Sequence, residues 1–233
     1  MQQDLHNYLN SDGKFRLYFF TKNFLPRINF YYLYRLDFKC LHHEKIAIFA
    51  SGSGSNAENI IQYFAQKPQF CVKSVFCNVP DAYVLERAKK YNVPTLVFNR
   101  SELRDPEKML HQLQADGIDF IILAGFLWLM PACITAAFPN RIINIHPALL
   151  PAYGGKGMYG HHVHEAVIAA GEKESGITIH YVNDHYDRGA IIFQAKCPVL
   201  PTDTPDDLAA RVHELEYRYF PQIIEETILK QEV

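Results

Sequence analysis

The sequence predicts an α/β fold: an open, mostly parallel, doubly wound sheet with helices on both faces. Short apolar runs of strand length recur along the chain, and stretches suited to helices lie between them. The 233 residues, 48% of them apolar, are enough to bury the core of one sizeable domain. Because strand and helix alternate, we expect right-handed βαβ crossovers and therefore a parallel sheet.

The apolar runs give the expected strands in chain order. The first five are expected to be buried parallel strands, at residues 45–50, 72–77, 94–98, 118–124 and 141–145. Two further strands are expected at residues 176–182 and 191–199. Ligands of open α/β sheets bind beyond the carboxyl ends of the strands. The loops after the first and the fifth strands are therefore candidate sites.

The helices are expected between these strands, at residues 56–66, 81–91, 105–116, 131–138 and 162–170. A last helix is expected to follow Thr204, the candidate N-cap, because Pro205 suits the first helical position and Asp207 the third. Proline loses no helical hydrogen bond there, since the first N–H groups of a helix have no partner inside it.

Charge and composition exclude several classes of protein. A formal net charge of −2 argues against a general nucleic-acid binder, which needs a basic surface. No run reaches the roughly 18 uncharged apolar residues that a membrane span requires. The five cysteines are scattered and odd in number, which suits reduced thiols in the cytosol. We therefore expect a soluble cytoplasmic protein that binds neither nucleic acid nor membrane.

Residues 1–44 differ from the rest of the chain. They are rich in Phe and Tyr, and Lys or Arg recurs every few residues. A basic leader of this kind can be a targeting segment, but the Ala and Ser content typical of such leaders is missing. We expect an N-terminal extension without a catalytic role, followed by one catalytic domain at residues 45–233.

The loop after the first strand, "SGSGSN", combines glycine with small polar residues. Residues 52–57 match the dinucleotide-binding pattern G-x-G-x-x-A in a strand–loop–helix context. However, no acidic residue that could bind a ribose lies between Glu58 and Asp81. Free N–H groups at a helix N-terminus still form an anion site, to which Ser55 and Asn56 can add hydrogen bonds. These features favour a mononucleotide or sugar monophosphate over a dinucleotide or a merely tight turn.

A second group of polar residues follows the later strands. Asn144 and His146 lie two residues apart at a strand end, so their side chains share one face. An amide donor beside an imidazole can polarise a carbonyl and move protons. His180 lies in a later strand, and Asp187 lies in the turn after it, where a carboxylate can hold an imidazole in its charged form. The alternatives are a structural histidine and an ordinary Asp-Arg-Gly turn.

Five motifs occur in order: "KIAIFASGSGSN", "ILAGFLWLMP", "NIHPALLPAYGGKGMYG", "GITIHYVNDHYDRGAII" and "RVHELEYRYFP". With this order and spacing, the chain from Lys45 to about Leu229 resembles the glycinamide ribonucleotide (GAR) formyltransferase family of de novo purine synthesis. The resemblance implies the Rossmann-like formyltransferase fold. The loop "YGGKGMYGHHVHEAV" is similar to that of members with a few extra residues there.

The resemblance implies transfer of a formyl group from 10-formyltetrahydrofolate, the co-substrate, to the amine of GAR. Asn144, His146 and Asp187 match the family's catalytic residues, and His180 matches a histidine that supports them. By resemblance, Asn144 donates to the developing oxyanion, while His146 stabilises it and moves protons. Asp187 would hold His146 charged and order a water. Neither a metal nor a covalent enzyme intermediate is implied.

The resemblance also assigns substrate contacts. The residues that match the GAR site are Gly54, Ser55, Asn56, His213 and Glu216. Those that match the folate cleft are Arg104, Leu127, Trp128, Leu129, Met130, Asn183 and Asp184. Three positions depart from the family pattern: His213 stands where Lys or Gln is common, Trp128 where a basic residue is common, and Arg188 where a small residue is common. These departures bear on the fit of the substrates.

Other functions remain open at this point. A formyltetrahydrofolate hydrolase shares the Asn/His/Asp set but usually carries an N-terminal regulatory domain, for which 44 residues are too few. A methionyl-tRNA formyltransferase carries a C-terminal tRNA-binding domain, whereas this chain ends at Val233. A non-catalytic nucleotide-binding protein would not need the Asn/His/Asp set. We expect small-molecule substrates and a monomer or homodimer.

The "HHVH" run at residues 161–164 could ligate a metal ion. Helical geometry points the imidazoles of His161 and His162 apart, however. No metal site is therefore expected.

Overall fold

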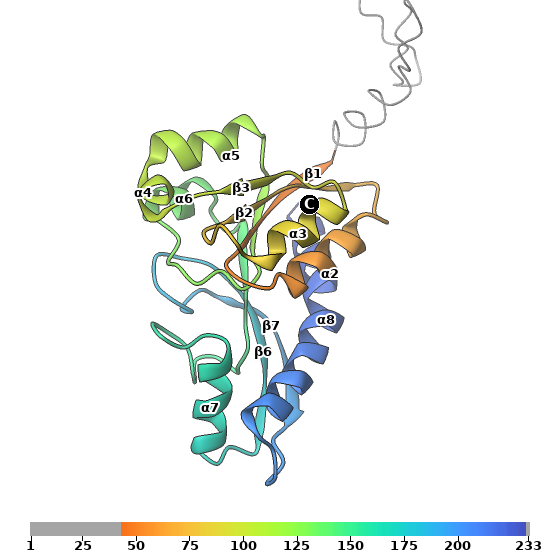
Figure 1. Cartoon of the computed structure of the whole chain (residues 1–233), viewed down its shortest axis with the longest axis vertical. Coiled ribbons are helices and arrows are strands. Elements are labelled where there is room, and N and C mark those ends of the chain that lie inside the picture. The colour runs from red at the N-terminus through yellow and green to blue at the C-terminus, as the bar shows by residue number, and fades with distance from the viewer. Residues whose placement is uncertain (1–42, 232–233) are drawn as a thin grey trace, which may run out of the picture. The chain divides into compact units, whose positions relative to one another are not determined.

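The computed structural model describes residues 43–231, which form a sheet with helices on both faces (Figure 1). The sheet has seven strands in the order β3-β2-β1-β4-β5-β6-β7. The first five strands pair in parallel, and the last two pair antiparallel. The strands are β1 (Glu44–Ala50), β2 (Phe70–Cys77), β3 (Thr95–Val97), β4 (Phe120–Leu123), β5 (Ile142–His146), β6 (Glu174–Tyr181) and β7 (Ile191–Pro198). The predicted fold class is confirmed.

Side chains alternate along the strands, so the sheet builds one core on each face. In β1, Ile46 and Ile48 face one core, and Ala47 and Phe49 face the other. The first core lies under α2, α3 and α8, and the second under α4, η2, α5 and α6 (Figure 1). The helices are α2 (Ser55–Phe64), α3 (Tyr83–Lys90), α4 (Arg100–Arg104), the π-helical turn η2 (Pro106–Leu110), α5 (His111–Ala115), α6 (Ala132–Ala137), α7 (His161–Ala169) and α8 (Pro205–Leu229).

The helix predicted at residues 105–116 is divided in two. It consists of η2 and α5, and α4 precedes them, which was not expected. The Asn99 side chain caps α4 by accepting hydrogen bonds from two N–H groups of its first turn. α4 ends at Arg104, because the next residue, Asp105, precedes a proline and therefore disfavours the helical conformation. Asp105 is accordingly extended, with φ −84° and ψ 107°.

The last helix begins as predicted. The Thr204 hydroxyl accepts a hydrogen bond from the Asp207 N–H at 3.2 Å, and Pro205 occupies the first helical position. α8 then runs for 25 residues. Because residues three apart share a face of a helix, His213 and Glu216 lie together on it.

Chain order reverses between β1 and β4, which are neighbours in the sheet. Ser51 joins the ends of these two strands. Its N–H donates to the Gly125 carbonyl at 3.0 Å, and its hydroxyl accepts from the Leu127 N–H at 3.0 Å. In an open α/β sheet, a ligand crevice forms at such a reversal.

The predicted N-terminal extension lies almost wholly outside the described residues. β1 begins at Glu44, and the division of the chain into two parts stays a prediction. None of the helices in the described part of the chain combines the length and apolar character that a membrane span needs. Cys77, Cys133 and Cys197 are free thiols.

Candidate active site

A cavity of about 740 Å³ lies at the carboxyl ends of β1, β4 and β5. Its wall includes the glycine loop at residues 51–56, the loop at residues 155–161 and one face of α8. A smaller cavity of about 50 Å³ adjoins the loop after β4. Asn144 and Asp187 line both cavities, so they lie where the two meet.

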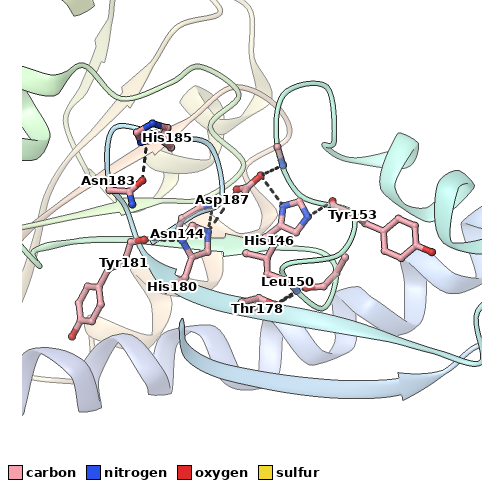
Figure 2. Close-up of polar contacts among 12 residues, drawn as sticks. Asn144, His146, Leu150, Tyr153, Thr178, His180, Tyr181, Asn183, His185 and Asp187 are labelled. Carbon is pink, nitrogen blue, oxygen red and sulfur yellow. Dashed lines mark hydrogen bonds and ion pairs between the residues drawn. The ribbon is translucent and has the colours of Figure 1, made fainter. Parts of the chain in front are cut away.

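β5 and β6 together position the first three polar side chains. Asn144 and His146 alternate with Ile145 along β5 and therefore share one face, and His180 of β6 pairs directly with Asn144. The His180 Nδ1–H donates to the Tyr181 carbonyl at 2.8 Å, which leaves Nε2 as an acceptor. The Asn144 amide donates to this Nε2 at 3.0 Å (Figure 2).

Asp187 faces both histidines from the turn after β6 (Figure 2). Its Oδ2 lies 3.7 Å from Nδ1 of His146, and its Oδ1 lies 3.6 Å from Nε2 of His180. The Gly155 N–H donates to Oδ2 at 2.8 Å. Burial raises the pKa of the Asp187 carboxyl, but His180, His146 and the Gly155 N–H together lower it by more. The carboxylate is therefore ionised at neutral pH.

His146 is neutral at rest. Its Nε2–H donates to the Tyr153 carbonyl at 2.7 Å, so Nδ1 is the unprotonated nitrogen that faces Asp187. Burial lowers the pKa of His146 below its ordinary 6.5, and the Asp187 carboxylate raises it only in part. The lowered pKa of His146 does not support the expectation that Asp187 keeps it charged, because desolvation outweighs the attraction of the carboxylate.

The glycine loop turns sharply at Gly54 before α2 begins. Gly54 has φ 74°, a conformation that favours glycine, and a Cβ atom there would lie 2.4 Å from Cβ of Val84. The first N–H groups of α2 have no partner inside the helix. This loop can therefore bind an anion through backbone N–H groups.

A second buried carboxylate lines the larger cavity. Glu216 is 5% exposed, and its Oε2 accepts hydrogen bonds from the Asn56 amide and from Nδ1–H of His213, each at 2.8 Å. The hydrogen bond to Glu216 raises the pKa of His213. The fold thus brings together, on the wall of the larger cavity, three residues predicted from distant parts of the sequence: Asn56, His213 and Glu216.

His164 was not predicted as a site residue, although it lines the larger cavity. It is 4% exposed, and its buried Nδ1 has no hydrogen-bond partner. Burial lowers the pKa of His164, and Glu216 opposes this only in part. The sequence signal for His164 is the "HHVH" run, in which the spacing of the histidines indicates a metal site rather than a single cavity residue. In residues 43–231, no group of three or more His, Cys, Asp or Glu side chains is arranged to hold a metal ion.

The predicted folate residues divide into two groups. Leu127 lines the larger cavity, and Trp128, Leu129 and Met130 line the smaller one. Arg104, Asn183 and Asp184 line neither cavity. Sequence reasoning missed Arg100, whose guanidinium lies 4.8 Å from the ring centre of Trp128. It also missed three residues of the cavity walls: Lys156, Tyr186 and His185.

Comparison with known proteins points to one family. A family model described as formyl transferase matches residues 44–224. Phosphoribosylglycinamide formyltransferase, chloroplastic, of Arabidopsis thaliana is 40% identical over 187 residues, which cover 78% of this chain and 64% of that protein. Phosphoribosylglycinamide formyltransferase of Haemophilus influenzae is 37% identical over 187 residues, which cover 78% of this chain and 85% of that one.

A solved structure agrees. The phosphoribosylglycinamide formyltransferase from Anaplasma phagocytophilum is 33% identical with a TM-score of 0.72, and the match covers 82% of this chain and 88% of that one. The chain spans 64% of the length of the Arabidopsis protein and 61% of the length of phosphoribosylglycinamide formyltransferase, chloroplastic, of Vigna unguiculata. The Arabidopsis protein is named chloroplastic, and the cytoplasmic location expected for this chain stays a prediction.

Proposed function

The chain belongs to the formyl transferase family, and from this premise we propose that it transfers a formyl group from 10-formyltetrahydrofolate to the amine of GAR. The relatives named above as phosphoribosylglycinamide formyltransferases support the choice of acceptor. The cavity of about 740 Å³ is within the range of small-molecule sites. The polar groups that line this cavity can bind the phosphate and hydroxyl groups of a phosphorylated sugar.

One observation carries the proposal. Asn144 and Asp187 lie at the junction of two cavities, one of which ends in the phosphate-binding loop and Glu216, while the other is walled by Trp128. A transfer reaction needs its catalytic groups where donor and acceptor meet. A hydrolase has no use for a phosphate grip, since its acceptor is water.

Proton transfer is the task that we assign to His146. The GAR amine attacks the formyl carbon, and its nitrogen must lose a proton as the new C–N bond forms. His146 Nδ1 is unprotonated at rest and takes this proton, and the ionised Asp187 3.7 Å away stabilises the resulting imidazolium. The proton then passes to the leaving nitrogen of the folate when the old C–N bond breaks.

Charge stabilisation is the task that we assign to Asn144. An amide nitrogen has two N–H donors, and Asn144 uses one of them for His180. The second is available for the oxygen of the formyl group, which gains negative charge in the transition state. Such a fixed donor acts where the charge develops. The bond to His180 holds the amide in the required orientation.

Binding of GAR is assigned to the glycine loop and α8. Gly54, Ser55 and Asn56 hold the phosphate at the N-terminus of α2. Glu216 is an acceptor for the hydroxyl groups of the ribose. When bound, 10-formyltetrahydrofolate would supply an activated formyl carbon, and Trp128, Leu129 and Met130 would contact its ring system.

The test is a formyl-transfer assay with GAR and with water as competing acceptors. We expect 10-formyltetrahydrofolate to be consumed rapidly only when GAR is present, with formyl-GAR formed in equal amount. Consumption at the same rate without GAR would instead assign a hydrolase.

A further inference from the structure

Arg87 of α3 contacts the glycine loop from outside the cavity. We propose that Arg87 is a positioning residue that fixes this loop in its anion-binding conformation. The inference rests on the proposed function, in which the loop holds the phosphate of GAR. Arg87 lines neither cavity, so its effect on binding is transmitted through the loop.

Three contacts hold the Arg87 guanidinium. Its Nε–H donates to the Ser53 carbonyl at 2.9 Å, and Nη1 forms an ion pair with the Glu58 carboxylate. The guanidinium also lies 4.9 Å from the centre of the Tyr83 ring. A planar cation with donors in a fixed fork can bridge a carbonyl and a carboxylate at once. These contacts connect the glycine loop to the first turn of α2 and to α3.

The bond to Ser53 orients a donor of the loop. The Ser53 carbonyl and the Gly54 N–H belong to one planar trans peptide, in which C=O and N–H point in opposite directions. When Arg87 draws the carbonyl toward α3, the Gly54 N–H is turned away from α3. Gly54 is part of the cavity wall. Arg87 therefore sets the direction of a backbone donor that an anion in the cavity would use.

α3 holds the neighbouring residues of the loop as well. The Val84 N–H donates to the Gly52 carbonyl at 3.2 Å. Val84 also packs so closely on Gly54 that a Cβ atom there would lie 2.4 Å from it. Because these two contacts do not involve the Arg87 side chain, they remain when Arg87 is replaced, and within the loop only the Ser53 peptide loses a contact. The predicted effect is loss of orientation in that peptide rather than collapse of the loop.

Lys90 provides a matched control on the same helix. Its Nζ lies 3.9 Å from the Glu58 carboxylate and 5.7 Å from the centre of the Tyr83 ring, so it shares two partners of Arg87. No hydrogen bond joins Lys90 to the glycine loop in residues 43–231. A comparison of the two cations therefore separates the bond to Ser53 from the effect of positive charge near the loop.

The experiment compares the full chain with Arg87→Gln, Arg87→Lys and Lys90→Gln. The readouts are the KM for each substrate, kcat, and the affinity for ribose 5-phosphate by calorimetry. For Arg87→Gln we expect KM for GAR to rise about tenfold and ribose 5-phosphate to bind about tenfold more weakly, since a hydrogen bond from a charged donor is lost. KM for the folate and kcat should stay within about twofold, and Lys90→Gln should resemble the wild type.

Several outcomes would overturn the inference. Unchanged affinity of Arg87→Gln for ribose 5-phosphate would do so, and so would equal losses in Arg87→Gln and Lys90→Gln, which would indicate a general effect of charge. If Arg87→Gln does not fold by circular dichroism, Arg87→Lys decides by the same criterion, since lysine lacks the planar fork that directs Nε to Ser53 and Nη1 to Glu58. If the wild type binds ribose 5-phosphate but does not formylate GAR, the proposed function is wrong. In that case the affinities of the variants for ribose 5-phosphate still test the role of Arg87.

Discussion

At the scale of single residues, burial decides which histidines of the site carry charge. His146 and His164 are both buried, and desolvation lowers the pKa of each below 6.5. His213 is more exposed and hydrogen-bonded to Glu216, which raises its pKa. The cavity wall therefore combines two buried imidazoles with lowered pKa values and one imidazole, beside Glu216, with a raised pKa.

The first prediction concerns Asp187. Asp187→Asn should lower kcat by about a hundredfold or more, because an amide cannot stabilise the imidazolium that forms on His146. KM for GAR should change little, since Asp187 acts mainly in the transition state. Steady-state kinetics with both substrates varied provides the measurement. A mild loss of kcat would mean that Asp187 has a structural role through Gly155.

The second prediction concerns His164 and pH. Its pKa in the folded chain lies below the ordinary 6.5, so the unfolded chain binds more protons and stability falls as pH drops from 6.5 toward the folded pKa. His164→Gln should remove this share of the pH dependence. The measurement is the free energy of urea unfolding at about pH 7.5 and about pH 5.

The control for His164 is His162→Gln on the same helix, since the His162 side chain is 64% exposed. It should leave the pH dependence unchanged. His213 contributes with the opposite sign: its stabilisation is present below pH 6.5 and is lost as pH rises through its raised pKa. A slope that His164→Gln does not reduce would contradict the prediction.

At the scale of elements, the site depends on contacts between helices and loops that lie apart in the sequence. α3 shapes the glycine loop through Val84 and Arg87, and α8 delivers Glu216 to Asn56. The loop at residues 153–155 supplies a carbonyl to His146 and an N–H to Asp187. His146, Asp187 and Asn56 are thus each oriented by an element other than their own.

The third prediction tests the packing of α3 on the glycine loop. Gly54→Ala should destabilise the protein by about 1–3 kcal/mol, because its φ of 74° is unfavourable for alanine and the new Cβ would collide with Val84. Gly52→Ala has no neighbour within 4 Å of the new Cβ and should leave stability nearly unchanged. Chemical unfolding of both variants provides the comparison, and equal effects would refute the packing argument.

At the scale of the whole molecule, a hydrophobic core packs against each face of the sheet and stabilises the arrangement of its strands. Phe49 of β1 stacks on Phe76 of β2 with ring centres 4.7 Å apart, and Ile46 and Ile48 fill the opposite core. The reversal of strand order between β1 and β4 leaves the crevice open at one edge. The oligomeric state, expected to be a monomer or homodimer, stays a prediction.

The fourth prediction concerns the extension at residues 1–44. β1 begins at Glu44, and every residue assigned above to catalysis or binding lies beyond it. A chain that starts at residue 43 should therefore keep kcat and both KM values within about twofold of the full chain. A large rise in either KM would show that the extension takes part in substrate binding.

The sequence by itself determined the features that depend on residues close together in the chain. These are the strands and most helices, the Thr204 cap, the glycine loop, and the placement of Asn144 and His146 on one face of a strand. The sequence did not reveal α4 or the division of residues 105–116 into η2 and α5. Only the tertiary structure decided the sheet order, the neutral state of His146, the presence of His164 in the cavity wall and the contact of Arg87 with the glycine loop. The physical reason is that burial and hydrogen bonding depend on neighbours remote in the chain, as with Asn56 and Glu216, which are 160 positions apart.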